Sequence, residues 1–301
     1  MPKLTSRQIH LVQHLISTDM DATTRQLIVD ILRDDTSKEH GSLVERLTKK
    51  LERDEVTRPQ FNDTLLYVEN AFEFCEDRYF LSEREEALFQ HIVKMRSVAG
   101  KMSGMGIRYL NASLLYGESG TGKTMFGRFL AHKLDLPFVY INLSFVISSL
   151  LGGTAQNLCA IFSDIKRHSC VFMLDELDCI GVERGKTNTG DADKERNNMT
   201  ISLIQLLDRV PSDAILLAAT NRKDIIDSAL LRRFSVKHEV TRLSENERIA
   251  LCKNFLASLP LEIPSVAKEE IMRMAEQNCT QADLNVILTE KIADVLLTEN
   301  D

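Results

Sequence analysis

Tryptophan is absent from this 301-residue sequence, aromatic residues make up only 6 % of it, and long apolar runs are lacking. No run reaches the ~18 residues of a membrane-spanning helix, so we expect no such helix. An excess of positive charge is also lacking. Lys and Arg total 37 against 44 Asp and Glu, and this net charge of −7 does not favour binding to nucleic acid or to an anionic membrane. The 44 % of hydrophobic residues excludes a largely disordered chain.

Signals for secretion and for disulfide formation are also lacking. Residues Met1–Ile16 mix His10, Gln13 and His14 into a helical pattern, which is not typical of a signal peptide. The cysteines include no C-x-x-C pair, and most stand among apolar residues. We therefore expect a cytoplasmic protein whose cysteines are reduced and buried. We expect neither disulfide bonds nor a zinc site. The cysteines are Cys75, Cys159, Cys170, Cys179, Cys252 and Cys279.

The first part of the chain is predicted to be a helical N-terminal domain, residues 1–81. Apolar residues recur there at helical spacing, as in the stripe formed by Leu27, Ile28, Ile31 and Leu32. A fourth helix is expected from about Phe61 to Phe80. Ser82 and Glu85 then fit a capping box, which predicts that a new helix begins and runs toward Val98.

The pattern changes after about Leu110, where short apolar runs alternate with amphipathic stretches. This alternation predicts an α/β fold, with a parallel sheet between two helical layers, over residues 82–243. A second capping box at Ser244 and Glu247 opens a small helical C-terminal part, residues 244–301. Its helices are expected at about Glu245–Leu256, Val266–Glu276 and Gln281–Thr298. The five strands are expected at Ser113–Tyr116, Phe138–Asn142, Cys170–Leu174, Ile215–Ala219 and Val236–Val240.

A glycine-rich motif follows the first of these strands. The residues Gly117-Glu118-Ser119-Gly120-Thr121-Gly122-Lys123-Thr124 fit G-x-x-x-x-G-K-[ST]. The glycines let the backbone curl so that its N–H groups can face a phosphate. Lys123 is expected to reach the β- and γ-phosphates of a nucleotide, and Thr124 to bind Mg²⁺. The predicted cofactor-binding residues are Glu118, Ser119, Gly120, Thr121, Gly122, Lys123, Thr124 and Met125.

Polar residues end two further predicted strands. Asp175 is expected to hold Mg²⁺, and the adjacent Glu176 to polarise the attacking water. Asn221 follows the next apolar strand and is expected beside Asp175, because ligands bind at the carboxyl ends of parallel strands. We expect Asp178 to cap or pair locally. The residues from Asn221 to Asp224 are not in the guanine-reading order N-K-x-D, which favours ATP over GTP.

Two adjacent arginines, Arg232 and Arg233, end a short amphipathic stretch. An arginine that reaches the γ-phosphate of a neighbouring subunit would stabilise charge during phosphoryl transfer. An ordinary pair of surface arginines is the alternative.

The order of these motifs resembles the AAA+ ATPases, which share the P-loop NTPase fold, and within them the AAA subgroup proper. The resemblance covers about Ser82 to Leu297. Within the subgroup, this part of the chain resembles the ATPase modules of ring unfoldases and of severing enzymes such as spastin and katanin. The stretch Asp175–Ile180 with Arg184 resembles D-E-x-D-x-I…R, and Cys279–Leu284 resembles the S-G-A-D-L that opens a helix of the lid. The resemblance implies a ring, usually a hexamer of identical chains, with ATP at the subunit interfaces.

This resemblance implies that ATP hydrolysis drives the remodelling or disassembly of a protein client. The alternative is a nucleotide-switched ring or adaptor that recruits partners, possibly DNA-processing ones, without threading anything. No H-E-x-x-H motif occurs in these 301 residues, so a protease would have to be a separate chain. We also expect that removing residues up to about Arg78 leaves ATP binding intact, because the nucleotide motifs start at Gly117.

Three departures from the family pattern stand out. Glu118-Ser119 replaces the usual Pro-Pro, and Leu231-Arg232-Arg233-Phe234 is a shortened form of L-R-P-G-R-F. The shortening leaves open which arginine acts, and the resemblance favours Arg233 because it directly precedes Phe234. In the expected pore loop, Ser149-Leu150-Leu151-Gly152 lacks the aromatic residue with which unfoldases grip a chain. If the protein threads a client, Leu150 and Leu151 face the channel; otherwise they belong to the core.

Overall fold

The computed structural model describes residues 28, 31–32, 66–69, 74–148, 158–163, 169–180, 191–259, 261 and 263–298. The chain divides into two compact units, Met1–Gln60 and Phe61–Asp301. In the first unit, Ile28, Ile31 and Leu32 are helical; Ile28 and Leu32 are buried, whereas Ile31 is exposed. The other helices predicted for the N-terminal domain lie outside the described residues, except that the predicted fourth helix is described over residues 66–69 and 74–80.

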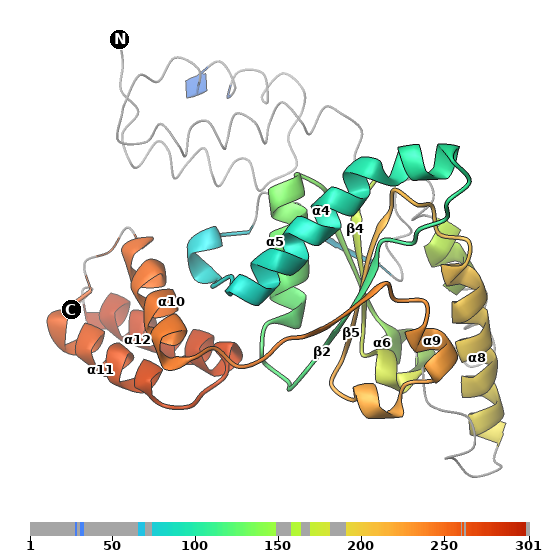
Figure 1. Ribbon diagram of the computed structural model, residues 1–301. Helices are drawn as coiled ribbons and strands as arrows, with labels where there is room; N and C mark the ends of the chain where they lie inside the picture. The colour runs from blue at the N-terminus through green and yellow to red at the C-terminus, as the bar shows by residue number, and fades with distance from the viewer. Residues whose placement is uncertain are drawn as a thin grey trace. The chain divides into compact units, whose positions relative to one another are not determined.

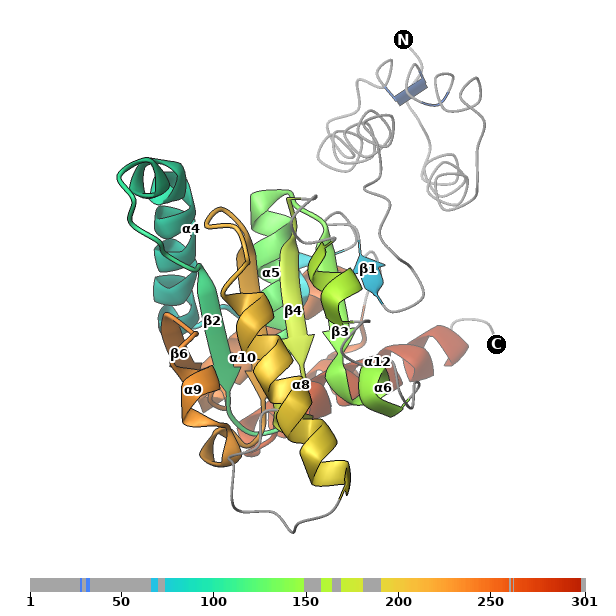
Figure 2. The same ribbon diagram turned by 90° about the vertical axis from the view of Figure 1, so that its right-hand side faces the viewer.

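A six-stranded sheet forms the centre of the second unit (Figures 1 and 2). Its strands are β1 Tyr67–Glu69, β2 Ala112–Tyr116, β3 Phe138–Asn142, β4 Val171–Asp175, β5 Ile215–Thr220 and β6 Val236–Glu239. The order across the sheet is β1-β3-β4-β5-β2-β6. Every neighbouring pair is parallel except β1 and β3, which are antiparallel. The carboxyl ends of β4, β5 and β2 therefore lie next to one another at one edge of the sheet.

Helices cover both faces of this sheet. In Figure 1, α4 and α5 lie on one side of it, and α6, α8 and α9 on the other. The helices of this core are α4 Glu83–Gly104, α5 Lys123–Leu134, α6 Leu143–Ser148, α8 Asp191–Leu207 and α9 Ser228–Leu231, with short 3₁₀ turns η2 Glu76–Arg78, η3 Leu177–Cys179 and η4 Lys223–Ile225. The structure is the three-layer αβα fold that the sequence predicted.

Alternating side chains of the central strands build two separate hydrophobic cores. Leu114 packs into the core beneath α6 and α8, whereas the next residue, Leu115, packs into the core beneath α4 and α5. Phe172 and Met173 of β4 divide in the same way. All four side chains are fully buried. Successive residues of a strand point to opposite faces, so continuous apolar runs indicate strands buried on both sides.

The five predicted strands are confirmed, each within two residues of its expected ends. The helix predicted from about Phe61 to Phe80 is wrong in its described part. Residues Tyr67–Glu69 form strand β1, and Glu76–Arg78 form a 3₁₀ turn. These residues also belong to the second unit rather than to an N-terminal domain that ends at residue 81.

Long-range contacts explain why this segment is not helical. Strand β1 satisfies backbone hydrogen-bonding groups at the open edge of β3, which a helix cannot do. Glu69 accepts two hydrogen bonds from the Arg128 guanidinium of α5, at 2.6 and 2.7 Å. Leu66 and Phe74 are buried in the two cores of the sheet. The apolar spacing of this segment fits a helix, but pairing and burial favour the strand.

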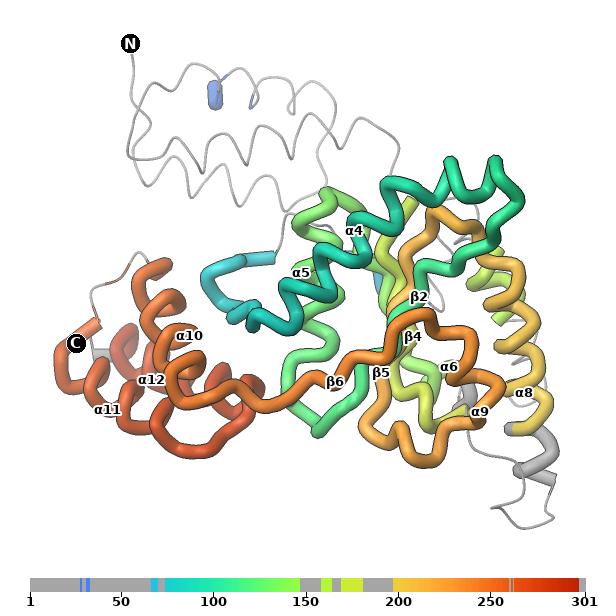
Figure 3. Tube along the Cα trace, viewed as in Figure 1, coloured from blue at the N-terminus to red at the C-terminus, as the bar shows by residue number. Residues whose placement is uncertain are grey.

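The C-terminal helices α10 Glu245–Ala257, α11 Ser265–Glu276 and α12 Gln281–Thr298 pack on one another around a separate core (Figure 3). Arg248 is buried at its centre and donates to the carbonyl oxygens of Ala275 at 2.7 Å and Leu243 at 2.6 Å. This arginine therefore ties α10 to the carboxyl end of α11. The capping boxes predicted at Ser82 and Ser244 are both present.

The cysteines are free thiols, but the expectation that they are buried holds for only part of them. Cys170 and Cys252 are buried, and burial raises their pKa to about 12 and about 11 respectively. Cys159 is exposed, because it lies on the outer side of the helical residues 158–163. Among the described residues, no helix combines the length and hydropathy that crossing a bilayer requires.

Two truncations test the position of the domain boundary. A chain that begins at Phe61 is expected to unfold in urea at the same midpoint as the second unit of the full chain. A chain that begins at Tyr79 loses the buried side chains of Leu66 and Phe74, which is expected to cost about 5 kcal/mol or more of the free energy of unfolding. Far-ultraviolet circular dichroism measures both. Equal midpoints for the two truncations would contradict this assignment and restore a boundary near residue 81.

Candidate nucleotide-binding site

The loop between β2 and α5 owes its shape to glycines in a left-handed conformation. Gly117, Gly120 and Gly122 have φ values of 148°, 76° and 105°. These values disfavour residues that carry a Cβ. At Gly117 a Cβ would also lie 2.2 Å from the carbonyl oxygen of Val240. Gly122 is the N-cap of α5, so the loop leads directly into the positive end of that helix.

Lys123 fills the inside of this loop. Its side chain is largely buried, and Nζ donates to the carbonyl oxygens of Gly117 at 3.0 Å and Glu118 at 2.7 Å. Burial lowers the pKa of Lys123, while the charges of Asp175 and Asp178 act in the opposite direction. The loop thus holds an ammonium group that an anionic ligand could contact.

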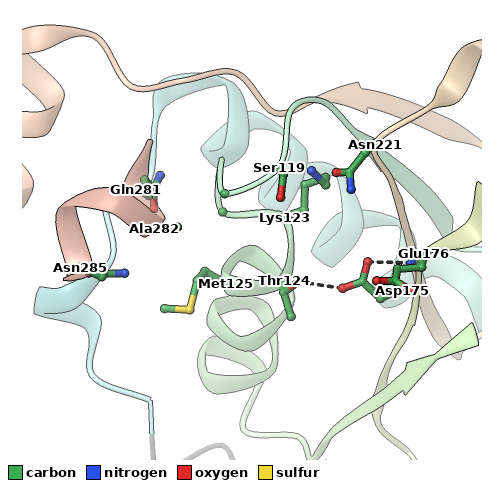
Figure 4. A pocket seen from close by; sticks show the side chains of 12 residues that line it. Ser119, Lys123, Thr124, Met125, Asp175, Glu176, Asn221, Gln281, Ala282 and Asn285 are labelled. Carbon is green, nitrogen blue, oxygen red and sulfur yellow. Dashed lines mark hydrogen bonds between the residues drawn. The ribbon is translucent and has the colours of Figure 1, made fainter. Parts of the chain in front are cut away.

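Acidic residues lie opposite the loop at the carboxyl end of β4. The Thr124 hydroxyl donates to Oδ2 of Asp175 at 3.1 Å, and the backbone N–H of Glu176 donates to Oδ1 at 2.8 Å (Figure 4). Glu176 adopts a φ of 58°, which is unusual for a residue other than glycine. Mg²⁺ prefers oxygen ligands such as hydroxyl and carboxylate groups, so the side chains of Thr124 and Asp175 fit this ion.

The register of the parallel strands brings Asn221 to the same pocket. Tyr116, the residue before the loop, pairs with Thr220, the residue before Asn221. Thr220 Oγ1 donates to Asp178 at 2.7 Å, so Asp178 pairs with a residue 42 positions away on the neighbouring strand, and not locally as the sequence had suggested. Asn221 itself lines the pocket together with Asp175 and Glu176 (Figure 4).

Three residues of the C-terminal helical part complete the pocket: Gln281, Ala282 and Asn285. The backbone N–H of Ala282 donates to the carbonyl oxygen of Gly120 at 3.2 Å. A Cβ at Gly122 would lie 3.1 Å from the amide oxygen of Gln281, so this side chain occupies the space that the glycine leaves open. None of these three residues is among the predicted site residues, although Gln281 and Ala282 belong to the stretch that resembles a lid motif.

Most of the predicted contact residues line this pocket, namely Ser119, Gly120, Gly122, Lys123, Thr124 and Met125. Glu118 and Thr121 do not belong to this lining. Thr121 is buried, and its hydroxyl donates to the carbonyl oxygen of Glu118 at 2.9 Å. The Glu118 carboxylate accepts a hydrogen bond from Arg242 at 2.7 Å. Glu118 therefore contributes its backbone to the loop, while its side chain binds the segment that leads to α10.

The two predicted arginines lie apart from this pocket and line a different cavity, together with Arg108 and Asp208. Arg233 donates to both carboxylate oxygens of Asp208, at 3.0 and 3.1 Å. These hydrogen bonds lower the pKa of Asp208. Within the described residues, the Arg232 side chain makes no hydrogen bond or ion pair. The expected pore-loop residues Leu150 and Leu151 lie outside the described residues.

Part of this chain, including most of the pocket, is similar to known proteins. Residues 113–242 match the family model of the "ATPase family associated with various cellular activities (AAA)". The chain is 32 % identical over 215 residues to the ATP-dependent zinc metalloprotease FtsH 1 of Thermomicrobium roseum, covering 70 % of this chain and 32 % of that protein.

Two proteasomal proteins show a comparable identity over somewhat shorter stretches. The 26S proteasome regulatory subunit 10B homolog A of Arabidopsis thaliana is 32 % identical over 202 residues, covering 65 % of this chain and 50 % of that protein. The proteasome-activating nucleotidase of Methanococcus vannielii is 34 % identical over 182 residues, covering 59 % of this chain and 44 % of its own. The matched part of this chain thus spans 32 to 50 % of the length of these relatives.

Proposed function

Since residues 113–242 form an AAA-family ATPase domain, we propose that this chain binds ATP with Mg²⁺ in the pocket of Figure 4 and hydrolyses it. The observation that carries the proposal is the meeting of three elements in one pocket: the lysine-filled loop after β2, the acidic end of β4, and the start of α12. Each element supplies a different part of what phosphoryl transfer requires.

The residues have distinct roles in this proposal. Lys123 turns from the loop carbonyls to the β- and γ-phosphates, and the glycine backbone accommodates them. Thr124 and Asp175 hold Mg²⁺, which neutralises negative charge on the phosphates. Glu176 accepts a proton from the attacking water, and Asn221 orients that water or the γ-phosphate.

Two substitutions test these roles. Lys123→Ala is expected to weaken ATP binding by at least about tenfold, because it removes the cation that faces the phosphates. Glu176→Gln is expected to retain ATP binding and to lower kcat by about 100-fold or more, because only the activation of water is lost. Calorimetry measures the binding, and phosphate release measures the hydrolysis.

Lys133→Ala is the matched control for the lysine, since Lys133 lies on the same helix and is bonded to Glu76 instead. Normal hydrolysis by the Glu176→Gln protein would show that Glu176 is not the base. Normal ATP binding by the Lys123→Ala protein would contradict the proposed phosphate loop.

We further propose a homo-hexameric ring in which one of the two arginines acts on the pocket of a neighbouring subunit. The support is that Arg232 and Arg233 line a cavity separate from the nucleotide pocket of their own chain. Arg233 is the candidate that the sequence favours, and it must leave Asp208 to reach a neighbour. Arg232 is the alternative.

Mixed subunits test this arrangement. Arg233→Ala and Lys123→Ala subunits, each inactive alone, are expected to regain part of the ATPase rate when mixed, because one kind of mixed interface has an intact pocket and an intact arginine. Phosphate release is measured against the mixing ratio, and light scattering confirms that mixed rings form. Absence of recovery in such rings argues against a shared interface. An inactive Arg232→Ala protein beside an active Arg233→Ala protein reassigns the role.

The proposed consequence of hydrolysis is the remodelling of a protein client. Similarity to FtsH proteases and proteasomal proteins supports this. The finer likeness to severing enzymes such as spastin and katanin is part of the proposal and rests on the sequence motifs alone. Six free thiols support a reducing compartment such as the cytoplasm. One sequence feature favours the alternative of a nucleotide-switched ring that recruits partners: Ser149–Gly152 has no aromatic residue with which to grip a chain.

Stimulation of the ATPase separates these two functions. For a remodeller, we expect an unstructured protein such as reduced, unfolded casein to raise the ATPase rate of the full chain several-fold. Leu150→Ala is expected to remove that stimulation and to leave the basal rate unchanged, because a channel residue lies away from the nucleotide. Stimulation by DNA or by one folded partner, with no response to casein, supports the switch instead.

A further inference from the structure

Tyr140 of β3 lies at the acidic end of the pocket, although no motif marks it. Strand β3 runs parallel to β4, and the register pairs Asn142 with Asp175. This places Tyr140 within reach of the carboxylate, and its hydroxyl donates to Oδ2 of Asp175 at 3.2 Å. The contact joins residues 35 positions apart in the sequence.

The hydrogen bonds of Asp175 show what Tyr140 adds. Oδ1 accepts from the backbone N–H of Glu176, and Oδ2 accepts from the hydroxyls of Thr124 and Tyr140. The first donor belongs to the same strand end, and the second to the phosphate loop. Tyr140 is therefore a donor from a third element, and with it both carboxylate oxygens are held by groups of fixed position.

The end of the strand that carries Tyr140 is held in place. Asn142 follows two residues after Tyr140 on β3 and points to the same face of the sheet. The amide oxygen of Asn142 accepts from the backbone N–H groups of Ser144 and Phe145, at 2.9 and 3.2 Å, at the start of α6. These contacts fix the end of the strand that carries Tyr140.

We propose that Tyr140 is a positioning residue of the metal site, and that its hydroxyl holds the Asp175 carboxylate in the orientation that binds Mg²⁺ together with a nucleotide. The proposal rests on the proposed function of this pocket. A carboxylate that is already oriented loses less rotational freedom on binding a cation than one held by fewer hydrogen bonds. Tyr140 therefore acts on the metal-dependent part of nucleotide binding, and not on the contacts of the phosphate loop.

The test separates the metal-dependent part of nucleotide binding from the contacts of the phosphate loop. It uses the full chain, with ADP as the ligand because ADP is not hydrolysed. ADP affinity is measured by calorimetry in EDTA and then across a titration of Mg²⁺. Mg²⁺ is expected to increase the affinity for ADP. Tyr140→Phe is expected to raise, about tenfold, the Mg²⁺ concentration at which half of this increase is reached, because a hydrogen bond to a charged group is lost. The affinity for ADP in EDTA is expected to stay unchanged. Tyr67→Phe is the matched control. Tyr67 pairs with Tyr140 across β1 and β3 and is exposed, and its hydroxyl makes no hydrogen bond to the described residues.

A second comparison shows whether Tyr140 acts through Asp175. In an Asp175→Asn chain, the further change Tyr140→Phe is expected to leave the Mg²⁺ dependence as it is, because the carboxylate that Tyr140 orients is gone. Independent, additive effects of the two changes would overturn the proposal. An unchanged Mg²⁺ dependence of ADP binding in the Tyr140→Phe chain would also overturn the proposal. This holds whether or not the melting temperature of that chain falls, because a purely structural role of Tyr140 predicts an unchanged Mg²⁺ dependence. A wild-type chain that binds no ADP under any condition instead contradicts the proposed function itself.

Discussion

The buried ammonium group of Lys123 is the constraint on which the nucleotide pocket depends. Burying a positive charge costs free energy unless polar groups surround it. The backbone meets this need by turning two carbonyl oxygens, those of Gly117 and Glu118, toward Nζ. Such a turn requires left-handed backbone conformations, which explains glycine at positions 117, 120 and 122. The loop is therefore shaped around a cation before any anion arrives.

The parallel sheet then brings the other chemical groups to this cation. Strands β4, β5 and β2 are neighbours, and their register places the residues before Asn221 and before the phosphate loop side by side. Asp175 receives a hydroxyl from Thr124 of the loop and another from Tyr140 of β3. Four strands thus contribute to one pocket because all of them end at the same edge. The C-terminal helices close it, and the hydrogen bond from Ala282 to Gly120 connects them directly to the loop.

The pair of Glu118 and Arg242 gives a physical meaning to one departure from the family pattern. The usual proline at position 118 could not bind this arginine, whereas the glutamate side chain links the phosphate loop to the segment that leads into α10. Both side chains are exposed to solvent, so the ion pair contributes little to overall stability. The pair does connect the loop to the segment before the C-terminal helices, and both the loop and α12 line the pocket.

Local sequence determined the elements with strong periodicity and the motif residues. The bounds of β3 and α12, both capping boxes and the pocket residues of the phosphate loop could be predicted, because spacing and turn chemistry act over a few neighbouring residues. Strand β1 could not, since its apolar spacing fits a helix and only the open edge of β3 favours a strand. The contacts of Tyr140 with Asp175, and of Gln281 and Asn285 with the pocket, were also decided by tertiary structure. These contacts join residues far apart in the chain. Such residues are brought together by strand order, register and helix packing, and no local sequence pattern encodes these.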